Sequence, residues 1–280
     1  MNIIANVMRA DRSAARSTSP LPSKPTVLVI GGGGALGSSV LEQLLARRGF
    51  GHVRVLATPR FRVGMQGLEP LVVGSFDDVE PVGASTGSHA EPVPDSHVAD
   101  IAVVVFDRER HANGRDEAFM RLAPEALPNA ARWLHGHGVR QLVVVMPHRT
   151  AGMPQTLTAG LASLDEQAVA SVGFSHVVFV RSAESPQQQR GGPLLARIAH
   201  SLLAQLVFMV PQAEQPVRAR KVAQFVAELA ARLPQADAGT RVAAPALLWQ
   251  ASQMAHSGAL VSAWLAGLPL PPISVPRRRM

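Results

Sequence analysis

Apolar runs alternate with helical patterns along most of the chain. Six runs rich in β-branched and aliphatic residues predict buried strands at residues 26–30, 52–58, 71–74, 99–106, 141–146 and 175–181. Helical periodicity follows the first run, covers residues 117–135 with interruptions at Pro124 and Pro128, and returns at residues 157–172. Strands that alternate with helices predict an α/β fold with a doubly wound parallel sheet.

The pattern changes to helices after residue 181. Helical periodicity covers residues 193–209 and 217–233, and a further strand is possible at residues 240–244. Residues 254–268 form an apolar helical stretch that is too short to cross a bilayer. This stretch could pack on the body of the protein or dock on a partner.

A glycine-rich loop joins the first predicted strand to the first helix. Its spacing fits both Gly-x-Gly-x-x-Gly and Gly-x-x-Gly-x-x-Gly, and glycine permits the tight turn and a close approach to a pyrophosphate. The pyrophosphate would lie at the helix N-terminus, where free N–H groups attract anions. We therefore predict a dinucleotide site at Gly31, Gly32, Gly33, Gly34, Ala35, Leu36 and Gly37.

The end of the second strand predicts the type of dinucleotide. An acidic residue there would hold the ribose 2′-hydroxyl of NAD, whereas a nearby arginine accommodates the 2′-phosphate of NADP. This chain has Thr58, Arg60 and Arg62 and no acid at that point. NADP is therefore favoured over NAD, although the two arginines could also simply solvate a loop.

Charge and composition exclude several function classes. The chain of 280 residues has a formal charge of +7, and its two ends carry most of that charge. Residues 1–25 contribute +3 and residues 272–280 contribute +3, so about +1 remains for the body, which argues against nucleic-acid binding. The chain contains no cysteine, which excludes disulfides and thiolate metal sites, and it contains no tyrosine.

These patterns suggest three parts. Residues 1–24 form an expected flexible N-terminal segment, residues 25–245 a Rossmann-like NAD(P)-binding domain with a helical C-terminal portion, and residues 246–280 an apolar helix with a basic, proline-rich tail. The first segment is rich in arginine and serine, which fits a bacterial leader or an organellar transit peptide. We expect a cytoplasmic protein, with the organellar matrix as the alternative.

Several local motifs resemble the atypical short-chain dehydrogenase/reductases, especially the NmrA-like group and the Tat-interacting-protein-like oxidoreductases. The resemblance spans roughly residues 25–245, and the glycine loop is its most specific part. The other matching stretches are residues 74–78 (GSFDD), 116–119 (DEAF), 138–140 (GVR) and 217–225 (VRARKVAQF), together with Glu166 and Gly173. The resemblance implies a Rossmann-type fold, a nicotinamide dinucleotide and a carbonyl substrate.

The catalytic residues that the resemblance implies are absent. The family holds the substrate carbonyl with a serine after the fifth strand and protonates it with the tyrosine of a Tyr-x-x-x-Lys helix. Here the fifth strand ends at Met146-Pro147-His148, and the tyrosine and lysine positions fall on Thr158 and Ala162. His148 and Thr158 are the remaining candidates for an acid. His135 and His137 lack a third ligand in the pattern, so no metal site is predicted.

The sequence therefore predicts a protein that binds NADP(H), or that has retained only the fold and binds no cofactor, and that has lost the standard catalytic residues. Such a pseudoenzyme would act as a regulatory, assembly or structural subunit that contacts a partner through its tails and the 254–268 helix. The alternative is an active NADPH-dependent oxidoreductase or isomerase that uses a different acid, such as His148.

Overall fold

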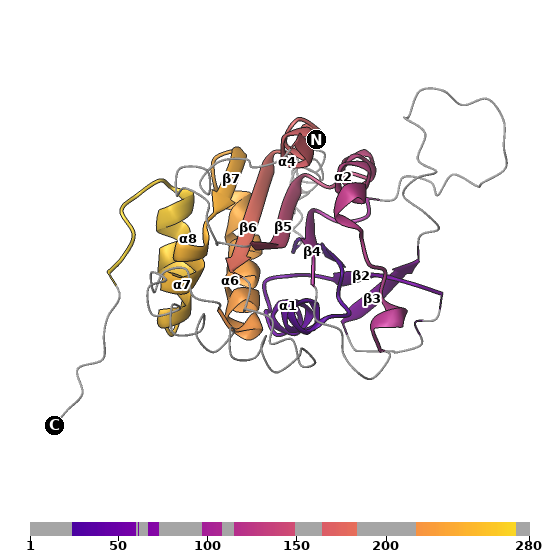
Figure 1. Cartoon of the computed structure of the whole chain (residues 1–280), viewed down its shortest axis with the longest axis horizontal. Coiled ribbons are helices and arrows are strands. Elements are labelled where there is room, and N and C mark those ends of the chain that lie inside the picture. The colour runs from indigo at the N-terminus through magenta and orange to yellow at the C-terminus, as the bar shows by residue number, and fades with distance from the viewer. Residues whose placement is uncertain are drawn as a thin grey trace, which may run out of the picture.

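The computed structural model describes residues 24–59, 61, 67–72, 97–107, 115–148, 164–183 and 217–272. Within these residues, seven parallel strands form one sheet in the order β3-β2-β1-β4-β5-β6-β7 (Figure 1). The strands are β1 (Val27–Ile30), β2 (Val53–Ala57), β3 (Leu68–Val72), β4 (Ile101–Val105), β5 (Gln141–His148), β6 (His176–Ala183) and β7 (Gly239–Ala243).

The strand order has the form of a doubly wound Rossmann-type sheet. The chain builds outward from β1 to β3, returns to the other side of β1 with β4, and continues outward to β7. The order therefore reverses between β1 and β4, and a crevice opens at the carboxyl ends of strands at such a point. The predicted fold class is confirmed, and the possible strand at residues 240–244 is present as β7.

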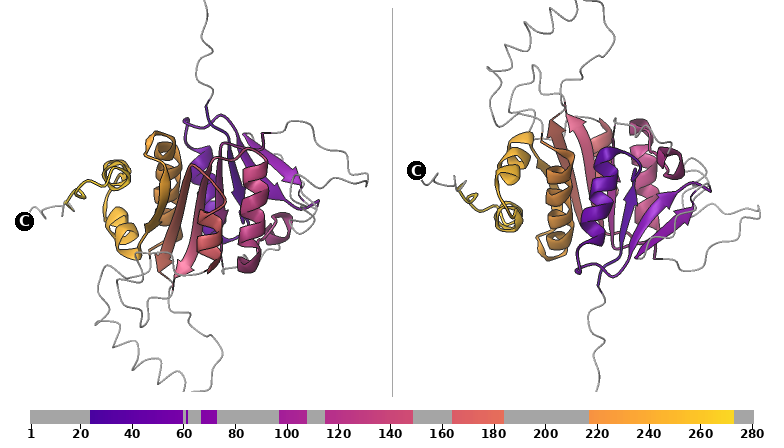
Figure 2. Two further views of the ribbon diagram at one scale, coloured as in Figure 1. Left: turned by 90° about the horizontal axis from the view of Figure 1, so that it is seen from above. Right: turned by 90° about the horizontal axis from the view of Figure 1, so that it is seen from below.

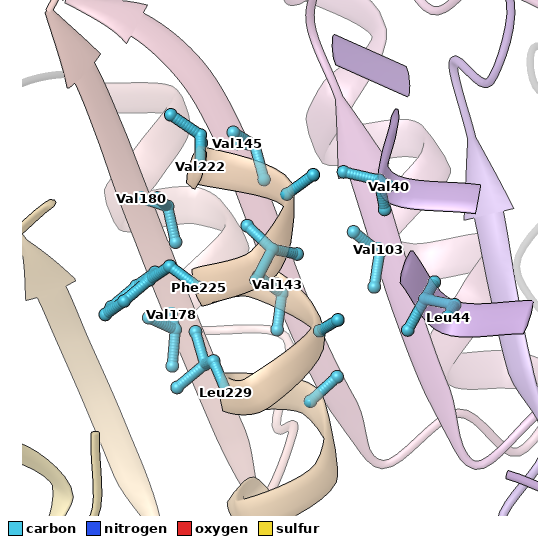
Figure 3. Packing of buried hydrophobic residues seen from close by; sticks show 14 of the residues in the cluster. Val40, Leu44, Val103, Val143, Val145, Val178, Val180, Val222, Phe225 and Leu229 are labelled. Atoms are coloured by element: carbon cyan, nitrogen blue, oxygen red, sulfur yellow. The ribbon is translucent and has the colours of Figure 1, made fainter. Parts of the chain in front are cut away.

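Helices cover both faces of the sheet. α1 (Ala35–Leu45) and α6 (Ala219–Arg232) lie side by side on one face, and α2 (Leu127–Gly136) and α4 (Leu164–Ala170) cover the other (Figure 2). The central strands β1 and β4 are apolar and buried on both faces because each face meets a helix layer. Val222, Phe225 and Leu229 of α6 pack on the valines of β5 and β6 (Figure 3).

The prediction of one helix over residues 117–135 is wrong. Residues 115–118 (Arg115–Ala118) form one 3₁₀ turn, Pro124–Ala126 form a second, and α2 begins at Leu127. A proline inside a helix removes a backbone donor and clashes with the preceding turn, whereas it is tolerated in the first turn. Pro124 and Pro128 accordingly lie at the beginning of helical segments. The predicted helix at residues 193–209 lies outside the described residues.

Two C-terminal helices complete the layer that contains α6. They are α7 (Pro245–Gln253) and α8 (Gly258–Leu265), and both contact α6. Leu260, Val261 and Leu265 of α8 are buried in the same apolar cluster as α6. The apolar side of the expected 254–268 helix therefore packs on this chain, and the expected domain boundary after residue 245 falls at the start of α7. No helix among the described residues is long and apolar enough to span a membrane.

An ion network joins α1, α6 and α8. The carboxylate of Glu228 on α6 accepts hydrogen bonds from Arg47, which follows α1, and from Arg232. Arg232 also donates to the hydroxyl of Ser262 on α8 at 2.9 Å. The Glu228 side chain is 12% exposed. Burial alone would raise the pKa of Glu228, but the hydrogen bonds and charges of Arg47 and Arg232 outweigh it and hold this pKa below its ordinary value.

We predict that Glu228→Gln lowers the free energy of unfolding at pH 7 by about 1–2 kcal/mol, because both arginines lose a charged acceptor. A lowered folded-state pKa stabilises the protein above the unfolded pKa of about 4.3, and this contribution is lost as the pH falls through the folded value. Urea unfolding should therefore show the deficit at pH 7 and a smaller one near pH 3.

Glu69→Gln is the matched control. Glu69 is half-exposed, and its pKa is lowered first by the hydrogen bond from Arg54 and also by His52. An exposed pair of this kind contributes only a few tenths of a kcal/mol. Equal losses in the two variants, or a Glu228→Gln deficit that does not change with pH, would contradict the assignment.

Candidate functional site

The glycine loop brings three backbone segments into direct contact. Gly31 has φ +87°, and a Cβ there would lie 2.1 Å from the carbonyl oxygen of Val105 on β4. A Cβ at Gly37 would lie 2.0 Å from the carbonyl oxygen of Gly31. Both distances are far below any real contact, so only glycine allows β1, β4 and α1 to approach this closely.

Asp107 binds the N-terminus of α1. Its carboxylate oxygen Oδ2 accepts a hydrogen bond from the amide of Leu36 at 2.5 Å and a longer one from the amide of Gly37 at 3.4 Å. The N-cap residue Gly34 has no side chain to do this, and a Cβ there would lie 2.3 Å from the same carboxylate oxygen. A residue that follows β4 therefore caps the first helix, at the place where the sequence predicts a pyrophosphate.

A cavity of about 480 Å³ extends from the glycine loop along the carboxyl ends of β4 and β5. Its walls are mostly apolar, with carboxylates and one arginine at its edges. The lining residues that bear on the chemistry are Gly31, Gly34, Asp107, Arg121, Met146 and Glu166. The cavity thus lies at the point where the strand order reverses, which is the usual ligand position in such sheets.

A buried ion pair forms part of the cavity wall. Glu166 at the start of α4 is 4% exposed, and Arg181 on β6 is 1% exposed. The guanidinium of Arg181 donates to the carboxylate of Glu166 at 2.9 Å. Removing either partner of a buried ion pair of this kind destabilises the folded protein, because the other charge is left buried and unpaired. It therefore fixes α4 to the sheet beside the cavity.

A short segment crosses the carboxyl end of β2, and we name residues 117–121 the crossing segment. Ala57 and Phe119 form an antiparallel bridge. The amide of Thr58 donates to the carbonyl of Ala118 at 2.9 Å, and the amide of Met120 donates to the carbonyl of Leu56 at 3.0 Å. The Thr58 hydroxyl also donates to the carbonyl of Glu117 at 2.7 Å. The end of β2 thus pairs with this chain's own backbone.

The predicted site residues separate into three groups. Gly31–Gly37 lie together at the loop and the start of α1. Thr58 lies at the end of β2, where its polar backbone and side-chain groups bind the crossing segment, and Arg60 lies outside the described residues. His148 ends β5, but its side chain is not among those described, and Thr158 is outside the described residues altogether.

Sequence reasoning missed Asp107 and the crossing segment as parts of the site. Asp107 begins a mixed charge run, which is usually a solvated loop, although the end of the strand before it is expected to face the cofactor crevice in this fold. Its position directly after a strand that neighbours β1 was the available signal, because the carboxyl ends of neighbouring parallel strands meet. Within the described residues, no group of three or more metal-ligating side chains occurs.

The residues present fit a dinucleotide only in part. The loop glycines provide the close backbone approach, and the cavity provides open space on the β5 side. The amides at the N-terminus of α1 already bind Asp107, and the end of β2 already binds the crossing segment. A diphosphate and its adenosine would need these same positions.

Comparisons with known proteins give low-identity structural likenesses. The fold is similar to that of the Bordetella bronchiseptica enzyme WbmG in complex with NAD, at 15% identity and a TM-score of 0.42 over 83% of this chain and 78% of that one. A Rossmann-fold NAD(P)-binding family protein from Shigella flexneri is 13% identical, with a TM-score of 0.40 over 77% of this chain and 90% of that one. BdcA in complex with NADPH is 16% identical, with a TM-score of 0.38 over 80% of this chain and 94% of that one.

No protein-family model matches the chain, and no curated protein matches it. The assignment of the Rossmann-type fold therefore rests on the strand order and parallel register of this chain itself.

We predict that Gly37→Ala destabilises the protein by about 1–3 kcal/mol, because the new methyl group overlaps the Gly31 carbonyl. Helix propensity alone would give the opposite sign, since alanine is favoured over glycine by about 1 kcal/mol within a helix. Chemical denaturation measures the difference. Gly49→Ala is the control: no atom lies within 4 Å of a Cβ there, so it should be neutral or slightly stabilising. A neutral Gly37→Ala would contradict the close approach.

Proposed function

We propose that the chain binds a nicotinamide dinucleotide at the carboxyl ends of β1, β4 and β5 and uses it in a regulatory, assembly or structural role. The observation that supports this most is the glycine loop. Its turn lies at the reversal of the strand order, excludes a Cβ at Gly31 and Gly37 by backbone contact, and opens onto the cavity.

The absence of tyrosine supports a role other than standard carbonyl reduction. Reduction of a carbonyl by hydride needs a proton donor near neutral pKa beside the nicotinamide. The chain has no tyrosine at any position, so no alignment can restore the donor that the sequence resemblance implies. The proposed protein therefore senses or holds the dinucleotide instead of turning it over by that route.

NADP is the proposed dinucleotide, with NAD as the weaker alternative. The end of β2 carries Thr58 and then Arg60, with no acid to hold a ribose 2′-hydroxyl. Because α8 uses its apolar side inside this chain, we assign contact with a protein partner to the basic N- and C-terminal tails.

An active oxidoreductase or isomerase is the second candidate. One observation favours it: β5 continues through His148, and Met146 and Pro147 just before it line the cavity. A histidine at that point could exchange a proton with a bound substrate near neutral pH.

A charge placed at the first turn of α1 tests cofactor binding. We predict that the wild-type protein quenches or enhances NADPH fluorescence on titration, and that Ala35→Glu weakens binding at least tenfold by repelling the diphosphate. Ala35→Gln has nearly the same shape and no charge, and it should bind about as well as the wild type. Circular dichroism confirms that both variants are folded. No binding of NADPH or NADH at millimolar concentration, by the wild type or by the variants described below that open the site, would refute the proposed function.

Hydride transfer separates the two candidates. We predict that purified protein with NADPH and a panel of aldehydes, ketones and quinones shows no loss of nicotinamide absorbance above background. Turnover that disappears in His148→Ala, while NADPH binding is retained, would overturn the non-catalytic role and establish the second candidate.

A further inference from the structure

We infer that the chain closes its own dinucleotide cleft, with Asp107 in the place of the diphosphate and the crossing segment in the place of the adenosine. The dinucleotide then binds only when both withdraw. This inference rests on the proposed function and adds regulation of the same site: the described conformation is the closed one.

The first step concerns charge. A diphosphate at this fold's glycine loop is bound by the amides of the first helical turn. In this chain the Leu36 and Gly37 amides bind the carboxylate of Asp107, which supplies the same kind of acceptor atom and the same sign of charge. Two anions cannot share one set of amides at hydrogen-bonding distance. Asp107 must therefore leave before a phosphate can arrive.

The second step concerns space. In a Rossmann-type sheet, the ribose next to adenine lies at the carboxyl end of the second strand. Here that end is paired with the crossing segment through the Ala57–Phe119 bridge and the backbone bonds of Leu56 and Thr58. Phe119 packs edge-on against Phe61, and its ring carbon Cδ1 would lie 3.2 Å from a Cβ at Gly32. An aromatic ring thus already covers the glycine loop.

The third step joins the two contacts into one device. Arg121, at the end of the crossing segment, donates from Nη2 to the backbone carbonyl of Asp107 at 2.8 Å. Movement of the crossing segment away from β2 therefore also removes the contact that holds the Asp107 backbone. The cavity on the β5 side is open at the same time, so the closure affects the adenosine diphosphate half of the cleft.

The cost of opening is small enough to be reversible. The described hydrogen bonds between the crossing segment and the end of β2 include two backbone bonds and one from the Thr58 hydroxyl, and Phe119 and Met120 are only partly buried. Net contributions of such bonds are modest, so a ligand that binds only the open form can shift the equilibrium. The apparent affinity for the dinucleotide is the affinity of the open form multiplied by the fraction of molecules that are open.

A removable cross-link tests the inference. Ala57 and Phe119 face each other in an antiparallel bridge whose flanking residues make the hydrogen bonds, and such pairs have Cα atoms about 4.5 Å apart, within the range that a disulfide spans. The chain has no cysteine, so an Ala57→Cys/Phe119→Cys variant carries a single possible disulfide. We expect the reduced variant to bind NADPH more tightly than the wild type and the oxidised variant to bind at least tenfold more weakly than the reduced one.

Arg121→Ala is a second variant, which removes one exposed side chain that donates to the Asp107 carbonyl, and circular dichroism checks that it is folded. We expect it to bind NADPH about threefold to tenfold more tightly than the wild type, the range that loss of one hydrogen bond from the closed form would give. Arg132→Ala is the matched control, since Arg132 is an arginine on α2 that bonds only its own helix among the contacts described. It should leave the affinity unchanged.

Hydrogen exchange on the wild-type protein provides a readout that needs no substitution. With saturating NADPH, the Met120 amide should exchange faster because it loses the Leu56 carbonyl, whereas the Leu36 amide should stay protected by phosphate. A Met120 amide that stays protected in the bound protein would overturn the inference.

The outcomes distinguish this inference from the proposed function. Equal NADPH affinity in the wild type, the oxidised and reduced double variant and Arg121→Ala would overturn the closed cleft and leave the binding function standing. No NADPH binding by any of these proteins, including the reduced double variant and Arg121→Ala, would overturn both.

Discussion

Backbone contact at the glycine loop is the constraint on which the rest of the structure depends. β1, β4 and the start of α1 meet with no room for a Cβ at Gly31 or Gly37. This contact sets how α1 crosses the sheet, and it directs the free amides of its first turn toward the end of β4. The position of Asp107, the cavity beside it and the packing of α6 against α1 follow from that placement.

Much of the fold could be predicted from the sequence because its central strands are buried on both faces. Runs such as residues 99–106 and 141–146 are apolar without alternation, and a sheet covered by helices on both faces is the arrangement that satisfies them. The glycine loop could also be predicted, since a strand pattern precedes the glycines and an amphipathic helix pattern follows them. The strand that became β7 was less certain, because it is short and partly exposed.

The content of the site could not be predicted in the same way. Asp107 caps a helix by binding the Leu36 amide, 71 positions earlier, and no local pattern reports a contact at that separation. The crossing segment was hidden by the helical periodicity of residues 117–135, which two prolines overrule. Neither feature violates a local rule. Each depends on which strand ends become neighbours, so each becomes visible only after the strand order is known.

The ion network around Glu228 also has a consequence for the order of folding during synthesis. Arg47 and Glu228 are 181 positions apart in the sequence. The apolar side of α1 packs on α6, which is similarly far away in the sequence. The central strands emerge from the ribosome long before α6 does, so one face of the sheet stays uncovered for much of translation. Val40, Leu44 and Val103 would be exposed to water or to chaperones during that interval. The last helices of the chain therefore complete the burial of its first one.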